Sequence, residues 1–509
     1  MNTSAPLAGS NRALLVGSVM LATLMQALDT TIANVALPDM KGALAATEDQ
    51  IAWVLTSYIV AAAIATPVTG WLAGRLGRRR LLIIAVTGFT VASLLCDLAG
   101  SIGQMVAYRI AQGLFGASLV PLSQSLLLDS FPREKHGPAM ALWGMGIMVG
   151  PILGPPPGGW LTENFSWHWV FLINLPVGVL ALLGILASVP REPLQQRRLD
   201  GVGLALLVVG IGALQMFLDR GQGEDWFDSL EIQIEAALAV LAMYFYVLWW
   251  WRRRERAMVD LSIFANANFA ISSAMIMVMG VVLFATLALL PPYLSGLMNY
   301  PTLLVGLVLA PRGLGTMISM MLAGRLLGRV DTRLLLATGM LLMVWSLHGM
   351  SQFGPSAPQA SVVLMGFVQG LGMGLVFVPI STVAYSTLPA HKRTEAAGVF
   401  SLVRNIGSSV GISLVMTLLA RATQTGHAEI GARIPAYGAE LSLIPSQWNP
   451  DTASGAWLLN NELTRQAMAI GYINNYWMMM WLTLAVLPLL LLMRPQQGPA
   501  SAAADAAGH

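Results

Sequence analysis

Long apolar runs separated by short polar stretches extend from one end of the sequence to the other. A helix needs about 20 apolar residues to cross the hydrocarbon core of a membrane, and fourteen runs meet this length. They lie at residues 13–37, 50–73, 80–100, 102–128, 137–160, 168–189, 199–219, 229–251, 267–295, 301–327, 332–351, 359–387, 394–420 and 469–493. The pattern therefore predicts an all-α membrane protein with fourteen transmembrane helices, which we call spans 1 to 14.

Basic residues are distributed unevenly over the loops between the spans. Most of the 28 lysines and arginines follow the even-numbered spans 2 to 12, whereas the alternate loops hold only a few. Because cytoplasmic loops are enriched in Lys and Arg, we expect the basic side to be cytoplasmic. Both terminal tails, residues 1–12 and 494–509, should then be cytoplasmic as well.

The composition excludes a soluble protein. Hydrophobic residues make up 56% of the chain and charged residues 10%, and the mean hydropathy is +0.67; soluble domains carry about 25% charged residues. The net charge of +3 arises from the basic loops and gives no indication of nucleic-acid binding. The single cysteine, Cys96, cannot form an internal disulfide. No signal-peptide cleavage pattern follows the first run, so we expect that run to remain a membrane helix.

Spans 2–5 and spans 10–13 share a sequence repeat. Matching residues recur at one constant separation: Gln112–Leu114 with Gln369–Leu371, Pro132 with Pro389, Gly150 with Gly407, and Gly154 with Gly411. Such a parallel repeat is typical of transporters built from two six-helix halves. We therefore predict an N-terminal bundle at 13–189, a C-terminal bundle at 267–493 and two additional central helices at 199–251. A long extracytoplasmic loop is expected at 421–468, with a short helix near its end.

Span 5 combines small residues and prolines in an unusual way. Gly146, Gly150 and Gly154 recur every four residues, so on a helix they form a stripe that allows a neighbouring backbone to approach closely. Pro151 and Pro155 remove backbone donors and predict a kink. Two interpretations fit: a plain packing helix, or a moving helix that seals the two halves against each other.

Five stretches resemble motifs of the major facilitator superfamily. The pattern GxxxGPxxGP of span 5 resembles the fifth-helix antiporter motif, and LDTTIANVALP at 28–38 resembles the first-helix motif of the fourteen-span drug:proton antiporters of the EmrB/QacA type. The others are GWLAGRLGRRR at 70–80, YRIAQG at 108–113 and WVFLINLPVG at 169–178. In the loop motif this chain has Gly74 where the family usually has Asp, so no gate contact is assigned to that carboxylate.

This resemblance implies a transporter and the partners of such a transporter. It implies proton-coupled efflux of lipophilic compounds across the bacterial inner membrane, driven by the proton gradient and without a cofactor. It also implies a periplasmic adaptor of the HlyD/EmrA type and an outer-membrane channel of the TolC type. Membrane lipids and small lipophilic substrates would be the remaining partners, and the family does not bind nucleic acid.

Asp29 and Arg109 are charged residues well inside spans 1 and 4. At 1.5 Å per residue, both lie roughly 12–14 Å below the outer ends of their helices. In the resembling fold these helices are neighbours, so we expect the two side chains to meet. Charges inside a membrane are costly and usually functional. The pair is interpreted as the proton-coupling site; a static ion pair that orients two helices is the alternative.

A gate is expected at the cytoplasmic face. In the resembling family, an acid at the end of span 4 pairs with the loop arginine, which here correspond to Asp129 and Arg78. Gly70 and Gly77 belong to the same motif. The alternative is that Asp129 is a helix-end carboxylate in water.

Other polar residues inside the spans are candidates for a central cavity. We expect Gln26, Gln112, Trp143 and Gln369 to face it. Arg312 would meet an anionic group of the substrate or pack against span 9, and Arg404 would contact the cytoplasmic loop or extend towards the cytoplasm. Methionines in spans 1, 5 and 10 suit a pocket for varied apolar ligands, although they are more often filler. No pattern of catalytic or metal-binding residues stands out.

These observations lead to one main hypothesis and two alternatives. The main hypothesis is a proton-coupled multidrug exporter. The first alternative is a narrow exporter of one metabolite, such as a fatty acid or a siderophore. The second is a receptor or scaffold that does not transport, for which Asp29 and Arg109 at one depth would have no purpose.

Overall fold

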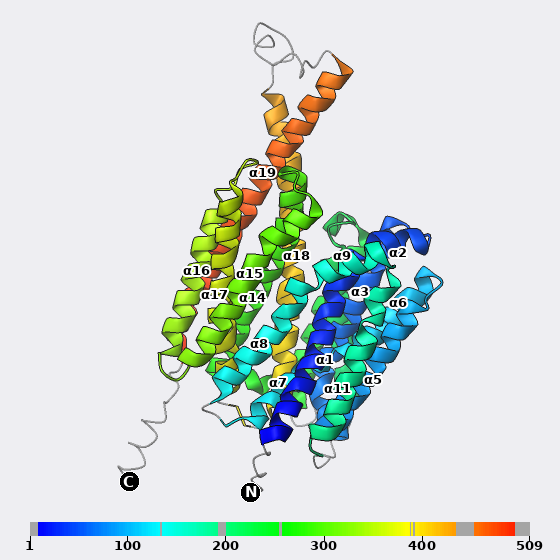
Figure 1. The fold of residues 1–509 in the computed structure, drawn as a ribbon, viewed down its shortest axis with the longest axis vertical. Helices are drawn as coiled ribbons and strands as arrows, with labels where there is room; N and C mark the ends of the chain where they lie inside the picture. The colour runs from blue at the N-terminus through cyan, green and yellow to red at the C-terminus, as the bar shows by residue number, and fades with distance from the viewer. Residues whose placement is uncertain are drawn as a thin grey trace.

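The computed structural model describes residues 9–132, 135–191, 200–253, 257–386, 388–389, 392–433 and 452–493, and these residues form helices without a β-strand. The first half contains eleven of them: α1 (Gly9–Val35), α2 (Leu37–Ala43), α3 (Glu48–Ala65), α4 (Thr69–Leu76), α5 (Arg78–Asp97), α6 (Ile102–Gly116), α7 (Leu119–Ser130), α8 (His136–Leu153), α9 (Pro155–Asn164), α10 (His168–Leu172) and α11 (Asn174–Ser188). The second half contains α14 (Ala267–Pro292), α15 (Thr302–Leu326), α16 (Thr332–Met350), α17 (Gln359–Ser386), α18 (Arg393–Ala432) and α19 (Ala453–Val486). Figure 1 shows the two halves side by side, with the N-terminus at one end of the bundles.

The predicted spans correspond to these helices. Thirteen helical segments of the described residues are long and apolar enough to cross a membrane. The remaining predicted span, 137–160, is α8 followed by α9. Several spans consist of two helices in line, because prolines and small residues interrupt them. Span 2, for example, is α3, a 3₁₀ turn at Thr66–Val68 and α4. The fold is therefore that of a fourteen-span membrane protein with two six-helix halves.

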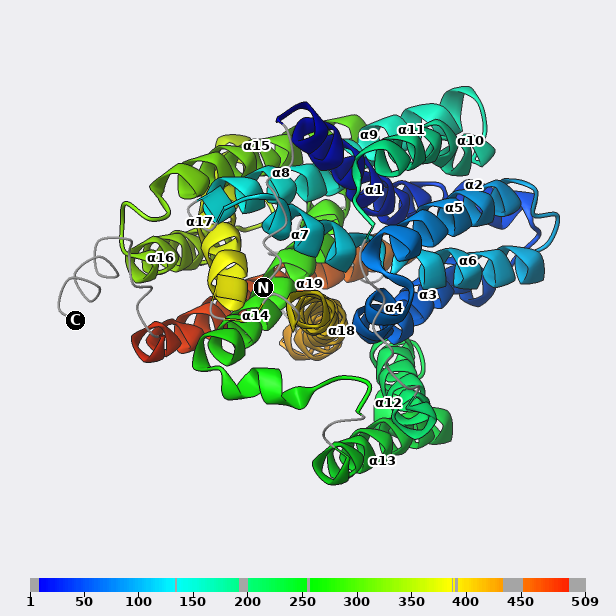
Figure 2. The same cartoon turned by 90° about the horizontal axis from the view of Figure 1, so that it is seen from below.

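The two additional helices lie at the periphery of the molecule. They are α12 (Gly201–Arg220) and α13 (Leu230–Arg252), and Figure 2 shows them outside both bundles, beside α3, α4 and α18. Gln215 on α12 donates a hydrogen bond to the Ser409 hydroxyl on α18 at 2.7 Å, and α12 also packs against α3. The two additional helices thus separate the halves in the sequence, as expected, and in space they lie against the edge at which the halves meet.

The predicted extracytoplasmic loop at 421–468 is largely helical. α18 continues to Ala432 and α19 begins at Ala453, so a pair of long helices projects beyond the bundles (Figure 1). A Cβ atom added to Gly426 would lie 3.2 Å from the Ala467 side chain, and His427 hydrogen-bonds Asn460 at 3.0 Å. The two helices thus stabilise each other outside the bundles. The prediction of a loop is wrong for the helical parts of this range, and residues 434–451 lie outside the described residues.

Close contacts between the two halves gather at one end of the bundles. A Cβ atom added to Gly137 at the start of α8 would lie 2.9 Å from the Leu327 side chain just after α15, and one added to Gly70 would lie 2.8 Å from Glu395 Cα on α18. Both positions require glycine because a neighbouring segment of the other half lies directly against them. This end carries the N-terminus (Figure 1), so it is the side expected to be cytoplasmic.

Candidate functional site

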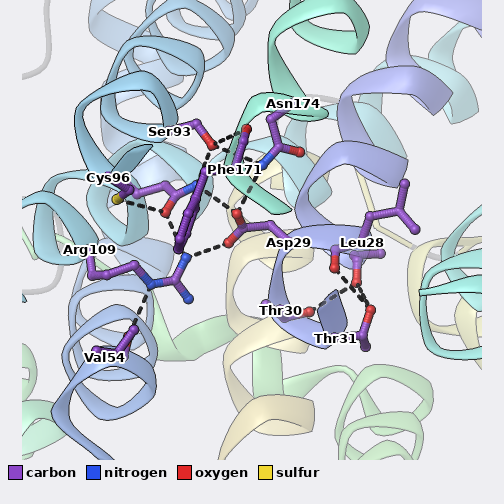
Figure 3. Close-up of polar contacts among 12 residues, drawn as sticks. Leu28, Asp29, Thr30, Thr31, Val54, Ser93, Cys96, Arg109, Phe171 and Asn174 are labelled. Carbon is purple, nitrogen blue, oxygen red and sulfur yellow. Dashed lines mark hydrogen bonds and ion pairs between the residues drawn. The ribbon is translucent and has the colours of Figure 1, made fainter. Parts of the chain in front are cut away.

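Polar side chains from three helices surround Asp29 of α1 in the interior of the first half (Figure 3). Asp29 lies on α1, Ser93 on α5, and Arg109 and Gln112 on α6, where their spacing of three residues places them on one face. Asn174 is the first residue of α11. All five side chains are buried. The site therefore lies within one half of the molecule and not between the halves.

The Asp29 carboxylate is held by three donors. Arg109 Nη1 donates to Oδ2 at 2.7 Å, while Gln112 Nε2 and Asn174 Nδ2 donate to Oδ1 at 2.7 and 3.0 Å. The same two amides also donate to the Ser93 hydroxyl, at 3.0 and 2.9 Å. An ionised carboxylate accepts hydrogen bonds only, so this arrangement matches the negatively charged form of Asp29.

The guanidinium of Arg109 is fixed by further contacts. Its Nε donates to the Val54 carbonyl at 3.0 Å, and Nη1 also donates to Gln112 Oε1 at 2.6 Å. The Tyr58 ring lies 4.4 Å from the guanidinium carbon, which is a cation–π distance, and Phe171 lies on another side at 5.8 Å. Nη2 has no hydrogen-bond partner among the described residues. α6 is thereby connected to α1 and α3 at this depth.

The expected contact between Asp29 and Arg109 is present, but part of the site was missed. Gln112 was expected to face a central cavity and instead binds Asp29. Asn174 and Ser93 were not identified as site residues. The sequence feature that could have identified Asn174 is its polar side-chain amide within the otherwise apolar run of span 6. The proton-coupling role of the pair remains a prediction.

Asp129 at the end of α7 binds two arginines from different halves. Arg78 Nη1 donates to Oδ2 at 2.5 Å and Arg393 Nη1 to Oδ1 at 2.8 Å. Arg78 begins α5 of the first half, whereas Arg393 begins α18 of the second. The predicted pair of Arg78 and Asp129 is present, and Arg393, which was not predicted, is the member that joins the halves.

A second connection ties the segment before α14 to the same end of α18. Lys392 Nζ donates to Asp260 Oδ2 at 2.8 Å, and the Asp260 backbone N–H donates to Glu395 Oε1 at 2.5 Å. Partial burial alone would raise the pKa of Asp260, but hydrogen bonds from Lys392 and Ser262 outweigh it and lower the pKa to about 2. The carboxyl is therefore ionised at every physiological pH.

The glycines of the predicted motifs have separate structural roles. Gly77 joins α4 to α5 with φ +80°, a conformation that favours glycine. Gly150 packs against α1, because an added Cβ would lie 2.6–2.7 Å from Ala27, and Gly154 faces Thr31 one turn further along. The stripe that includes Gly146 thus faces α1 of the same half.

The expectation that this stripe seals the two halves is wrong. The opposite face of α8 makes that contact, through Gly137, Ala141 and Gly144. Helix α8 ends at Leu153 and α9 begins at Pro155, so the predicted interruption follows Pro151 and coincides with Pro155.

A small cavity lies between α8, α14, α15, α17 and α18. Most of its lining is apolar, and Met148, Met279, Met320, Met373 and Phe377 form much of the wall. Arg404 of α18 is the one charged residue in the lining. Because α8 belongs to the first half and the other helices to the second, this cavity lies at the interface of the halves, where an alternating-access transporter binds its substrate.

The residues predicted to face a central cavity are not among those that line this space in the described part of the chain. Trp143 stacks on Phe377 across the interface, with ring centroids 6.2 Å apart. Gln369 is buried and donates to the Thr286 hydroxyl at 3.1 Å. Arg312 is buried and its Nη2 donates to the Leu283 carbonyl, a cavity residue, at 3.4 Å. Gln26 is half-buried on α1, one turn before Asp29.

Comparison with known proteins adds family information to this geometry. A profile of the Major Facilitator Superfamily matches residues 19–412. Multidrug export protein EmrB of Haemophilus influenzae is 36% identical over 501 residues, which cover 97% of this chain and 98% of that protein. Fatty acid resistance protein FarB of Neisseria gonorrhoeae is 35% identical over 500 residues, covering 96% and 97%. The solved structure of the proton:xylose symporter XylE shares the fold, with a TM-score of 0.64 at 14% identity over 96% of this chain and 97% of that one.

Proposed function

This chain belongs to the major facilitator superfamily, and we propose that it is a secondary active transporter that exports lipophilic drugs and toxic compounds in exchange for protons. Members of this family are membrane transporters and not enzymes. The observation that carries the proposal is the buried Asp29 carboxylate, which is paired with Arg109 inside the membrane-spanning part. A relative of nearly equal length, named for multidrug export, supports the choice of substrates.

Protonation of Asp29 changes the hydrogen bonds that hold α1. The ionised carboxylate accepts from Arg109, Gln112 and Asn174. A protonated carboxyl is neutral and has become a donor at one oxygen, so it cannot keep all three donors with the same strength. α1 is then held less firmly against α6 and α11, and this loosening is the proposed coupling step.

Contacts of α1 with α8 provide a route from this site to the substrate cavity. Thr31 lies two residues beyond Asp29, and its hydroxyl donates to the Gly150 carbonyl of α8 at 3.1 Å. The other face of α8 packs on α15 of the second half. We propose that a shift of α1 moves α8 relative to α15 and so changes access to the cavity.

Asp129 serves as the cytoplasmic gate in this proposal. Its bonds to Arg78 and Arg393 connect the two halves at the end that carries the N-terminus. Opening to the cytoplasm requires that the Arg393 bond break, because Arg393 and Asp129 belong to halves that must separate. The Lys392–Asp260 pair lies beside this gate and moves with α18.

The proposed location is the bacterial inner membrane with both termini in the cytoplasm. The projecting α18–α19 pair then lies on the extracytoplasmic side, since it is at the opposite end of the bundles from the N-terminus (Figure 1). We propose that this pair contacts a periplasmic adaptor of the HlyD/EmrA type, which passes substrate to an outer-membrane channel of the TolC type. The proton gradient would be the only energy source, without a cofactor.

A narrow exporter of one metabolite is the second candidate function. It is favoured by the relative named for fatty acid resistance, which aligns over nearly the whole chain. Competition between structurally unrelated substrates for export separates the two candidates: a broad exporter shows mutual inhibition, whereas a narrow one responds only to close analogues.

Proton flux in proteoliposomes tests the proposed function. Purified protein is reconstituted with a pH-sensitive dye inside the vesicles, and a lipophilic substrate is added outside without an imposed gradient. An antiporter moves protons when substrate is added, and Asp29→Asn abolishes that flux. A receptor or scaffold gives no substrate-dependent flux, and this result would contradict the proposal.

A further inference from the structure

Arg404 borders the interface cavity, and among the described residues it has no acidic partner. Arg404 lies eleven residues after Arg393, so it is roughly 16 Å into the membrane from the gate. Among the described residues, its guanidinium donates only to the neighbouring Asn405 side chain, at 3.4 Å. Arg312 lies one turn before the cavity residue Thr316, and its Nη1 has no hydrogen-bond partner in the part of the chain that the structure describes. Among the described residues, no carboxylate forms an ion pair with either arginine.

In the first half, a buried arginine is neutralised by a carboxylate. Arg109 has the Asp29 carboxylate at 2.7 Å. The sequence separation that relates Gln112 to Gln369 also relates Asp29 to Thr286, and the structure preserves the pairing, since Gln369 donates to the Thr286 hydroxyl. The second half therefore repeats the hydrogen bond but holds a neutral hydroxyl where the first half holds a carboxylate. Arg312 and Arg404 of the second half form no ion pair among the described residues.

We propose that Arg404 binds the anionic group of the transported substrate, so that the preferred substrates are lipophilic anions with a carboxylate or sulfonate group. This proposal rests on the proposed export function and specifies its substrate class. The methionine and phenylalanine walls take the apolar body of the substrate. The planar guanidinium of Arg404 donates to the two oxygens of the anionic group, and Arg312 adds positive potential from behind Leu283.

Physical chemistry favours an anion over a cation in this cavity. A charge in an apolar environment is costly unless an opposite charge or hydrogen-bond partner is present. An entering anion supplies that partner for Arg404, whereas an entering cation adds a second positive charge. Because Arg404 is not held by an acid of the protein, the substrate does not have to displace an internal ion pair.

Binding of two matched probes tests the proposal. Decanesulfonate and decyltrimethylammonium carry the same alkyl chain, and each keeps its charge at every pH used. Their affinities are measured by equilibrium dialysis with the full chain in lipid nanodiscs, and empty nanodiscs provide the background. We expect the sulfonate to bind at least about tenfold more tightly than the ammonium ion, and Arg404→Gln to lose at least about tenfold in sulfonate affinity. The ammonium ion should bind Arg404→Gln as well as it binds the parent.

Matched variants separate this role from general damage. Arg421→Gln removes an exposed arginine near the outer end of α18 and should leave sulfonate binding unchanged. Leu283→Glu and Leu283→Gln change the same cavity side chain to groups of equal size, and only Glu should abolish the preference for the sulfonate. If Arg404→Gln does not fold, the comparison of Leu283→Glu with Leu283→Gln still tests whether the cavity prefers an anion.

Equal affinity of the parent for both probes, or undiminished sulfonate binding by Arg404→Gln, would overturn the proposal. Absence of binding by either probe would do the same. These binding results do not depend on transport. The proposed export function is tested separately: if it is wrong, the parent protein shows no substrate-driven proton flux.

Discussion

The ion pair between Asp129 and Arg393 is predicted to hold the cytoplasmic gate closed. We consider Arg393→Gln, which keeps most of the side-chain length but removes the charge that reaches Asp129 across the two halves. The side chains of Arg393 and Asp129 are 9% and 23% exposed. Because water partly screens them, we expect the pair to contribute about 1–2 kcal/mol to the closed state, less than a fully buried pair. This free energy corresponds to about a 5- to 30-fold increase in the population of the open gate.

Alkylation of a cysteine at the interface measures this change. Ala141 on α8 is buried against Gly324 of α15, so Ala141→Cys is protected while the gate is closed. Cys96, the only native cysteine, is replaced by serine. N-ethylmaleimide should then react about 5- to 30-fold faster in Arg393→Gln than in the parent. Arg80→Gln removes an exposed arginine from the same face and serves as the control.

A double-mutant cycle distinguishes this pair from a general charge effect. Asp129→Asn combined with Arg393→Gln should accelerate alkylation less than the sum of the two single effects in free energy, because both remove the same contact. Arg78→Gln should have a smaller effect than Arg393→Gln, since Arg78 and Asp129 belong to the same half. Additive effects, or an unchanged alkylation rate in Arg393→Gln, would refute the gate assignment.

Three further predictions concern other parts of the molecule. Asn174→Ala removes one donor to Asp29 and should lower proton-driven export by about tenfold, measured as substrate accumulation in vesicles; an unchanged rate would remove Asn174 from the site. Asp260 has a pKa lowered to about 2, so its contribution to stability is present above its unfolded pKa and is lost only as the pH falls towards 2; the decrease in melting temperature caused by Asp260→Asn should therefore be equal at pH 5 and pH 8. Deleting residues 425–464, which include the projecting ends of α18 and α19, should reduce drug resistance in cells yet leave substrate binding by the purified protein intact, whereas unchanged resistance would argue against adaptor docking.

Hydropathy predicts where this chain crosses the membrane but not how far its helices continue outside it. The apolar signal of span 13 ends near residue 420, while α18 continues to Ala432. The continuation is polar and has no apolar periodicity of its own. It is stabilised by the partner helix, through contacts such as His427 with Asn460. A tertiary contact of this kind cannot be derived from the local sequence, so the range appeared to be a loop.

The Asp29–Arg109 contact was predictable because depth along a helix follows from counting residues. That count does not show which face of the helix a side chain lies on, or which neighbouring helix that face contacts. Gln112 was assigned to the cavity, although its spacing of three residues from Arg109 already placed both on one face. The stripe of span 5 was recognised as a close-packing surface, but the sequence does not specify whether α1 or α15 lies against it. Arg393 was missed because its partner Asp129 belongs to the other half.

Substrate accumulation by Asp29→Asn tests the central claim most directly. Asparagine has nearly the size of aspartate and cannot exchange a proton, so the variant is locked in a neutral state similar to the protonated one. The protein is reconstituted in vesicles with an imposed pH gradient, and accumulation is measured alongside substrate binding in detergent. We predict that the parent concentrates substrate, whereas Asp29→Asn binds it but does not concentrate it. Accumulation by Asp29→Asn equal to that of the parent would contradict the account and would place the proton-coupling site elsewhere in the chain.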